Sequence, residues 1–376
     1  MDTLEHIYIE NVLLDEIQSD RYEKTLKGVM DVLIFHMKKT PLFYQFFDEV
    51  YFGGSFFDGL KLASTSQEFD LNLVFKFKSD IKVKGLNTEY SKPNFAYLKL
   101  EDGYFLGPTK SERQLSVEWE TKGIIFLSPS KLLKLVETAA DESLARLNGK
   151  IPFNGKAYNV KKHSVGVPYT LAVDCKEDNF EFTIDLVPAV SLQITKLEKG
   201  VQARVKTINK IFNSRVDKCM AIALKPVDKD RFEIDFHDIE RDILRWRKIA
   251  KMVVMLMKHL RDIKGGPLDK FWSHLLKTVV MNKVIESESR SWWTNLYEQN
   301  CWDEGNVEKC LIDCMEAWIN GIDNGINDAF FPDLDMMDRL SKFPQALSDT
   351  RQFLRKLKEK ISDSKGVFRG YYWKKV

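Results

Sequence analysis

Apolar side chains near the start of the chain recur at helical spacing; they are Tyr22, Leu26, Val29, Met30, Leu33 and Met37. Residues three, four and seven positions apart lie on one face of an α-helix. This pattern predicts a long amphipathic helix over residues 3–39, bent near Ser19–Asp20. We expect it to end before Thr40–Pro41, because proline disfavours helical backbone in the residue before it.

Strand patterns follow this first helix. The segments EFDLNLVFKFK (68–78) and NFEFTIDLV (179–187) alternate apolar and polar residues, and GIIFLS (123–128) is a short apolar run. Glycine, asparagine, aspartate and proline separate these segments, as is typical of strands joined by turns. A helix over 128–147 is predicted between them, since Ser128 and Pro129 suit the N-cap and the first helical position.

Helical periodicity dominates the second half of the chain. Helices are predicted over 200–214, 238–262, 267–285, 306–324 and 345–362. The fold class is therefore α+β, with a mixed lobe at 1–200, a helical lobe at 201–376 and a cleft between the two.

The composition indicates a well-packed soluble chain of 376 residues, 44% hydrophobic and 30% charged. The net charge is only +2, so a nucleic-acid-binding surface requires lysines and arginines gathered on one face. The five cysteines form no C-x-x-C pair, which favours a reducing compartment and buried roles for Cys310 and Cys314. An acidic N-terminus and apolar runs far shorter than about 20 residues predict a cytoplasmic protein without a membrane span.

Two carboxylates stand two positions apart in the first predicted strand. Glu68 and Asp70 share one face of that strand, while Phe69 points to the other. Neighbouring like charges need compensating cations, and carboxylate oxygens suit Mg²⁺ or Mn²⁺. Two such ions activate an attacking oxygen and hold phosphates. An E-x-D pattern alone, however, is more often a solvated strand face.

A third carboxylate and a glycine turn strengthen this interpretation. Asp185 is the last polar residue before an apolar run and is favoured as the third ligand; Asp174, beside an expected turn, is the weaker candidate. Gly53, Gly54 and Ser55 precede the E-x-D pair. Glycines let backbone amides approach a phosphate, and the serine hydroxyl adds a donor. Together these residues indicate nucleotidyl transfer.

The segment GGSFFDGLKLASTSQEFDLNLVFKF (53–77) resembles the activation loop and catalytic strand of cyclic GMP-AMP synthase and the cyclic GMP-AMP synthase-like receptors. Segments that match the family in order are VPYTLAVD (167–174), FTIDLVPAV (182–190), FHDIERDIL (236–244), MLMKHLRD (255–262) and LDKFWSHLLKT (268–278). This resemblance covers nearly the full length. It implies a bilobal polymerase-β-type nucleotidyltransferase core with a long N-terminal spine helix and a helical C-terminal lobe.

The resemblance implies a role for each matching residue. Glu68, Asp70 and Asp185 match the family's catalytic, metal-binding carboxylates. The residues that match its nucleotide-binding positions are Gly54, Ser55, Glu240, Lys258, Ser273 and His274. His274 stands where vertebrate members have a base-stacking tyrosine, which leaves base preference open.

The resemblance also implies a nucleic-acid activator. Vertebrate members insert a His-Cys-Cys-Cys zinc thumb where ILRWRKIAKMVVMLMK (243–258) continues without a cysteine, so no structural zinc is expected. The thumbless insect receptors that sense double-stranded RNA are the better match. The candidate RNA contacts are Lys24, Lys27, Lys38 and Lys39 on the first helix and Arg241, Arg245, Lys248 and Lys251 later. Charged rows of this kind are also typical of ordinary solvated faces.

The expected function is an RNA-activated innate immune sensor that makes a cyclic dinucleotide of the cyclic GMP-AMP type from ATP and GTP. The loop over 53–59 is expected to change shape when RNA binds, and an RNA-dependent oligomer is a further expectation. Two alternatives stay open: a catalytically silent scaffold of the same fold, and a linear oligoadenylate-type synthase.

Overall fold

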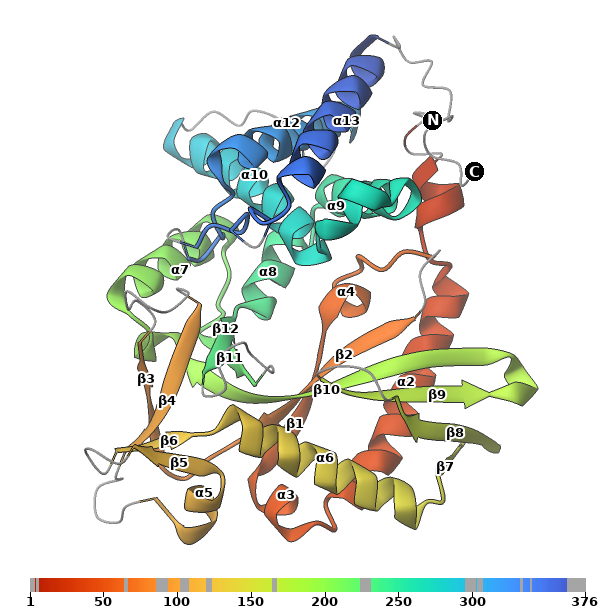
Figure 1. The fold of residues 1–376 in the computed structure, drawn as a ribbon, viewed down its shortest axis with the longest axis vertical. Coiled ribbons are helices and arrows are strands. Elements are labelled where there is room, and N and C mark those ends of the chain that lie inside the picture. The colour runs from red at the N-terminus through yellow and green to blue at the C-terminus, as the bar shows by residue number, and fades with distance from the viewer. Residues whose placement is uncertain are drawn as a thin grey trace.

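The computed structural model describes residues 4, 7–63, 67–85, 94–101, 108–119, 124–163, 168–223, 231–294, 302, 307–331, 334–338 and 340–363. Residue 3, where the first helix was expected to begin, and Cys301 lie outside them. A twisted sheet with two covering helices forms the lower part of the molecule, and the helices of the second half gather above it (Figure 1). This arrangement of mixed sheet and helix confirms the predicted α+β class.

The centre of the sheet is the long strand β10 (Phe180–Gln193). It runs parallel to β2 (Glu68–Phe75) on one side. On its other side it is antiparallel to β9 (Tyr169–Cys175) and then to β11 (Lys218–Ile222). β1 (Phe47–Gly53) pairs antiparallel with β2, so the strands that carry the predicted carboxylates are adjacent and central.

The remaining strands extend the sheet on both sides of this centre. Their bounds are β3 Asp80–Lys84, β4 Phe95–Glu101, β5 Ser116–Trp119, β6 Ile124–Leu127, β7 Lys150–Phe153, β8 Lys156–Lys162 and β12 Phe232–Asp235. The order is β5-β6-β4-β12-β11-β10-β9-β8-β7, with β3 on β4. In β2 the side chains alternate between exposed and buried at the first four positions, as the sequence pattern predicts.

The helices α2 (Glu16–Met37) and α6 (Pro129–Arg146) pack against the sheet and against each other. The predicted cap of α6 is confirmed, because Ser128 Oγ accepts a hydrogen bond from the Lys131 amide at 3.4 Å. The predicted helix over 3–39 was expected to bend near Ser19–Asp20, but the break lies earlier, at residues 13–15. A π-helical turn at Tyr8–Val12 ends at Leu13, which bridges Leu62, and α2 starts afresh after Asp15.

The upper part of the molecule is built from helices. Their bounds are α7 Lys199–Phe212, α8 His237–Leu244, α9 Lys248–Lys264, α10 Ser273–Thr294, α12 Val307–Asn324 and α13 Pro344–Asp363. The expected single helix over 238–262 is wrong, since residues 245–247 separate α8 from α9. The helix expected from 267 begins only at Ser273, because Gly266–Lys270 forms a short 3₁₀ helix around Pro267. Short helices also occur at α3 Pro41–Phe46, α4 Gly54–Phe57 and α5 Lys110–Gln114.

One continuous core of buried apolar side chains runs from the sheet into the helices. The N-terminal π-helical turn joins it at α9, where the Tyr8 hydroxyl donates to Met255 Sδ at 3.6 Å. Cys310 and Cys314 are fully buried on α12, as the sequence predicts. A division of the chain near residue 200 stays a prediction. Within the described ranges, no helix combines the length and apolarity needed to cross a bilayer.

Candidate active site

Two adjacent strands bring the three predicted carboxylates together. The parallel register of β2 and β10 sets Asp70 directly opposite Asp185 and Glu68 opposite Thr183. Glu68 and Asp70 lie on the exposed face of β2, while Phe69 is buried on the other face. The weaker candidate Asp174 lies on β9 and accepts a hydrogen bond from Asn159 Nδ2 at 2.9 Å. The geometry therefore favours Asp185 as the third carboxylate.

These carboxylates repel one another in a partly buried position. Burial raises the pKa of Asp70 and of Glu68, and the charge of Asp185 raises both further. Asp185 is oriented by Thr170, whose hydroxyl donates to Oδ1 at 2.5 Å. Lys61 lies close enough to oppose both shifts. Three clustered oxygen donors with unfavourable mutual charge fit hard divalent cations such as Mg²⁺.

The glycine turn packs directly on this cluster. Gly53, at the end of β1, pairs with Asp70 across the sheet. Gly54 has a φ of +78°, and a Cβ placed there lies 2.2 Å from Asp70 Oδ2. The backbone conformation and the space therefore both require glycine at this position. Beyond the turn, the ring of Phe56 packs edge-on against Phe69 at 4.7 Å, which anchors α4 to the buried face of β2.

Lys258 reaches the same loop from α9. Its ammonium donates to Ser55 Oγ at 3.2 Å and to the Leu60 carbonyl at 2.7 Å. Burial lowers the pKa of Lys258 to about 8, and the neighbouring charges of Arg261 and Lys61 contribute. Two residues expected to contact the nucleotide are thus already in contact with each other, although they are 203 positions apart in the sequence.

Behind the loop lies a buried network of ion pairs. The Lys277 ammonium contacts Asp58 Oδ2 and Glu240 Oε2, each at 2.7 Å. Asp58 also accepts from Arg241 Nε at 3.3 Å, and the Arg241 guanidinium donates to the Phe52 carbonyl at 3.0 Å. Burial alone would raise the pKa of Glu240, but Lys277 and the neighbouring histidines lower it to about 2. The network fixes the loop to both α8 and α10.

The remaining predicted nucleotide contacts start α10. Ser273 Oγ accepts a hydrogen bond from Arg261 Nη1 at 3.1 Å. His274 lies between Glu240 (Nδ1 to Oε1, 3.9 Å) and Asp328 (Nε2 to Oδ2, 3.8 Å). Burial opposes protonation, but Asp328 and Glu240 raise the pKa of His274 to about 9, so the ring is an imidazolium at neutral pH. With Trp272 it lines a pocket of about 60 Å³.

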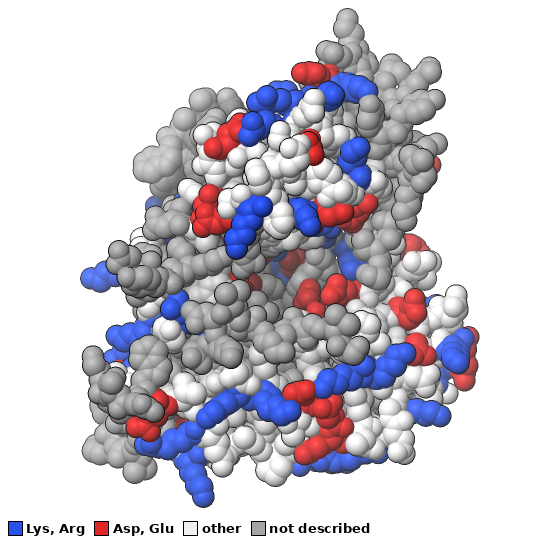
Figure 2. Space-filling model, in the orientation of Figure 1, with Lys and Arg blue, Asp and Glu red and all other residues white. Residues whose placement is uncertain are grey.

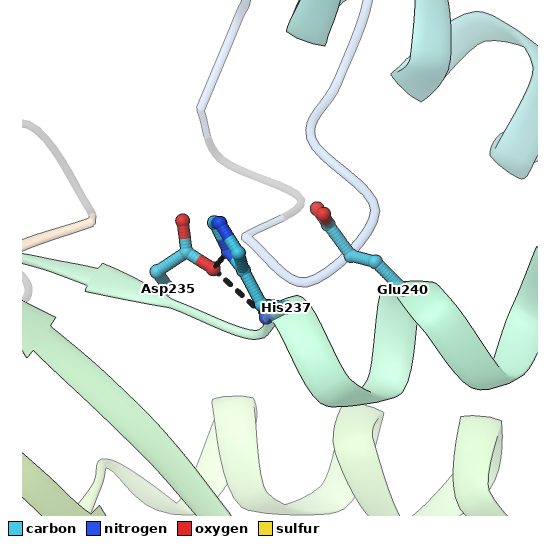
Figure 3. Close-up of side chains that lie close together, drawn as sticks. All are labelled: Asp235, His237 and Glu240. Carbon is cyan, nitrogen blue, oxygen red and sulfur yellow. Dashed lines mark hydrogen bonds and ion pairs between the residues drawn. The ribbon is translucent and has the colours of Figure 1, made fainter. Parts of the chain in front are cut away.

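A second cluster of possible ligands occurs at the start of α8. Ligand atoms of Asp235, His237 and Glu240 lie within 4.8 Å of one another (Figure 3). His237 Nδ1 contacts Asp235 Oδ1, and this carboxylate, against the effect of burial, raises the pKa of His237 to about 9. In this cluster His237 is already paired with Asp235 and Glu240 with Lys277, so a metal ion would have to displace both partners. The strand carboxylates Glu68, Asp70 and Asp185 are therefore the better candidates for a metal site.

Several predicted nucleic-acid contacts form one band beside the loop, which we call the basic strip: Lys27, Arg241, Arg245 and Lys251. Lys27 Nζ lies 5.8 Å from the Phe52 ring centre, and Arg241 binds the carbonyl of the same Phe52. Lys251 Nζ lies 3.6 Å from a Cβ placed at Gly59. Burial and the nearby charges of Arg241 and Arg245 lower the pKa of Lys251. The strip thus joins α2 to α8 and α9 across the loop.

The other predicted nucleic-acid contacts on the first helix lie outside the basic strip. Lys38 and Lys39 are at the far end of α2, about 16 Å along the helix axis from Lys27 by the rise of 1.5 Å per residue. Their ammonium groups lie over the rings of Phe47 and Phe35. Lys24 and Lys27 are exposed but pair with Asp20 and Glu23 one turn earlier. Such exposed pairs contribute little stability, so they can exchange for phosphate contacts.

Among the described residues near the site, the sequence patterns did not reveal Asp58, Lys61, His237 and Lys277. Lys61 and His237 lie close enough to Asp70 to affect its pKa. For Lys277, its position three residues after His274 on a predicted helix was the available signal, because residues with that spacing share a face.

The site combines three carboxylates on two central parallel strands with an adjacent glycine-serine turn. Figure 2 shows acidic side chains gathered in the hollow below the helices. This combination defines the molecule as a nucleotidyltransferase. The Mab-21 protein nucleotidyltransferase domain family matches residues 56–245, about half of the chain. The chain belongs to this family, which confirms the predicted nucleotidyltransferase class.

Curated relatives extend the similarity beyond that domain. A cyclic GMP-AMP synthase-like receptor of Aethina tumida is 25% identical over 299 residues, covering 76% of this chain and 71% of the relative. A receptor of the same name from Trichogramma pretiosum is 24% identical, over 67% of this chain and 52% of the relative. A cyclic GMP-AMP synthase-like protein of Drosophila melanogaster is 24% identical, covering 79% of each. The resemblance to cyclic GMP-AMP synthase-like receptors is therefore confirmed.

Proposed function

We propose that this chain is a cytoplasmic innate immune sensor, activated by double-stranded RNA, that converts ATP and GTP into a cyclic dinucleotide of the cyclic GMP-AMP type. The observation that carries the proposal is the register that sets Asp70 opposite Asp185, with Gly54 packed on Asp70. The names of the relatives support the class of product.

The three carboxylates Glu68, Asp70 and Asp185 are the residues that would hold Mg²⁺ or Mn²⁺. Bound there, such ions supply positive charge that lowers the pKa of the acceptor hydroxyl and offsets charge on the triphosphate. Thr170 keeps Asp185 aimed at the site through its hydrogen bond. The buried position of Asp185 limits the water that competes for these oxygens.

The loop and α9 would hold the triphosphate. Ser55 offers a hydroxyl, and Lys258, whose pKa is about 8, carries a positive charge at neutral pH. Their mutual contact leaves the ammonium in place to meet phosphate oxygens when the loop moves. The hydroxyl oxygen of one nucleotide attacks the α-phosphorus of the other, and pyrophosphate leaves as its bond to that phosphorus breaks. A second transfer of the same kind closes the ring.

The start of α10 would hold the base of a nucleotide. The His274 imidazolium can stack on a purine, as a cation over an aromatic face. Glu240 and Asp328 hold the ring from its two nitrogen sides, which fixes its plane. Ser273 adds a hydroxyl one residue earlier, beside Arg261.

The basic strip supports double-stranded RNA as the activator. Lys27, Arg245 and Lys251 present positive charge next to the loop that carries Ser55, so a duplex on the strip can influence the active site. Binding of this kind is led by phosphate contacts and weakens as salt rises. A long duplex can contact several molecules at once, so we also propose assembly on RNA.

The proposal is tested by incubating the purified chain with ATP, GTP and Mg²⁺ or Mn²⁺, with and without long double-stranded RNA or DNA, and separating the products. RNA-dependent cyclic dinucleotide is expected. Activity without RNA, or with DNA only, contradicts the sensor assignment. Linear oligoadenylate would favour a synthase of that type, and a lack of product under all conditions a silent scaffold. Asp70→Ala is the control that should remove product and keep RNA binding.

A further inference from the structure

Trp246 is exposed to a degree that is unusual for so large an apolar side chain. It retains 77% of its accessible surface and lies in the short break between α8 and α9. An indole ring can bury some 150–250 Å² in a contact and carries an N–H donor, so an exposed tryptophan can serve as a contact residue. Neither the nucleotidyl-transfer site nor the predicted RNA contacts include this residue.

The local backbone holds Trp246 outward because its neighbour is anchored inward. Arg247 donates to Glu288 Oε1 from Nη2 at 2.5 Å and from Nε at 3.1 Å. It also donates to the Ile243 carbonyl at 3.0 Å and lies 4.7 Å over the Phe212 ring. Arg247 is thus held on three sides, while the side chain of the preceding Trp246 lies on the outside of the protein. The backbone that carries the exposed indole is therefore anchored to the rest of the protein.

A positive charge lies beside the ring. The Arg245 guanidinium lies 5.1 Å from the centre of the indole, and Arg245 and Lys248 are both exposed. Arg245 is also near enough to Lys251 to lower its pKa, which places Trp246 at the end of the basic strip. The adjacent carboxylate of Asp242 accepts a hydrogen bond from the Ser214 hydroxyl at 2.7 Å. A cation beside an exposed aromatic ring, with a second exposed cation two residues further on, favours a polyanion over an apolar protein surface.

We propose that Trp246 lies against the sugars in the minor groove of double-stranded RNA, with Arg245 and Lys248 on the flanking phosphates, and that it favours RNA over DNA. This inference rests on the proposed function. The A-form minor groove is wide and shallow and displays 2′-hydroxyl groups, which suits a flat ring with an N–H donor. The B-form minor groove is only about 6 Å wide and about 7.5 Å deep, so it does not admit the indole face.

The test measures the affinity of the full chain for an RNA duplex and for a DNA duplex of the same sequence, each at several salt concentrations. Trp246→Ala should weaken RNA binding about tenfold, the order of one aromatic contact. Its DNA binding should be unchanged, and so should the slope of affinity against salt, because no phosphate contact is lost. Trp246→Phe should keep part of the RNA preference.

Two control variants separate charge from ring contact. Lys248→Ala should weaken both duplexes and reduce the salt slope by about 0.9, the value for one phosphate contact. Tyr44→Ala removes another exposed aromatic, 67% accessible, from α3 at the lower end of the molecule, away from the break between α8 and α9 (Figure 1), and should leave the preference for RNA over DNA unchanged. Melting temperatures of all variants should match that of the parent chain, since each altered side chain is exposed.

Each other outcome overturns the inference. Equal losses on RNA and DNA from Trp246→Ala, or no loss at all, remove the proposed discrimination while the RNA-sensor function stands. Unchanged RNA binding with a lower oligomeric state would make the ring a contact between copies of the chain. If the parent chain binds no double-stranded RNA but binds DNA, the proposed activator is wrong and the role of Trp246 falls with it.

Discussion

Replacing Gly54 with alanine should nearly abolish nucleotidyl transfer while leaving the protein folded. The Cβ of alanine lies 2.2 Å from Asp70 Oδ2, and real Cβ atoms do not approach within 3.0 Å, so the carboxylate must retreat by about 0.8 Å. A displacement of about 1 Å at a reacting centre can cost about 100-fold in rate. We therefore expect a fall in kcat of about two orders of magnitude.

The same substitution also strains the backbone, and this cost must be separated from the effect on Asp70. Gly54 has a φ of +78°, where an alanine costs about 1 kcal/mol or slightly more. Gly155, in the turn between β7 and β8, has a φ of +73° with no atom within 4 Å of the added Cβ. Gly155→Ala therefore carries the same backbone strain without touching a carboxylate, and is the matched control.

The assay measures initial rates of pyrophosphate release with saturating ATP, GTP, Mg²⁺ and the RNA activator, together with the free energy of unfolding in urea. Both variants should lose about 1 kcal/mol of stability, but only Gly54→Ala should lose activity. If the two variants have the same rate within a factor of two, the close packing of Gly54 on Asp70 has no catalytic importance and our reasoning is refuted.

Three further predictions concern the charges around the site. Asp70→Asn should abolish metal-dependent transfer but keep RNA affinity in a binding assay; retained turnover would exclude it as a ligand. Lys277→Met should lower the free energy of unfolding by about 3–5 kcal/mol, because it leaves two buried carboxylates undercompensated, whereas exposed Lys24→Met should be near neutral. His274 has a pKa of about 9 in the fold against about 6.5 unfolded, so its stabilising ion pairs should be complete below pH 6.5 and lost as the pH rises through 9. His237 also has a pKa of about 9 in the fold, so in urea titrations from pH 6 to 10 His274→Gln should remove only the part of the decline that belongs to His274; an unchanged decline would exclude His274 as a contributor.

Local patterns predicted the parts of the site that depend on one strand or one turn. Alternation in β2 placed Glu68 and Asp70 on one face and Phe69 in the core, because a strand repeats every two residues. The position of Asp185 before an apolar run indicated its depth. The pairing of Asp185 with Asp70 could only come from the sheet, since their strands are more than a hundred residues apart.

The break between α8 and α9 had no local signal. Residues 243–251 contain no glycine or proline, and their apolar spacing fits a continuous helix. The chain departs from the helix because Arg247 binds Glu288 and packs on Phe212, both far away in sequence. Contacts of this kind override helix propensity, which amounts to less than about 1 kcal/mol per residue for all but proline. The exposed position of Trp246 follows from the same contacts.

Charged residues show most clearly why sequence spacing alone was insufficient. Arg241 and Arg245 are one turn apart and were predicted to form one exposed row, yet Arg241 is tied to buried Asp58 and to the Phe52 carbonyl. A phosphate that binds Arg241 must compete with a carboxylate that has little water to replace the lost partner. Within the described residues, the structure pairs neither Arg245 nor Lys248 with a carboxylate. Loss of Arg241 should therefore disturb the loop that carries Ser55, whereas loss of Arg245 or Lys248 should weaken RNA binding alone.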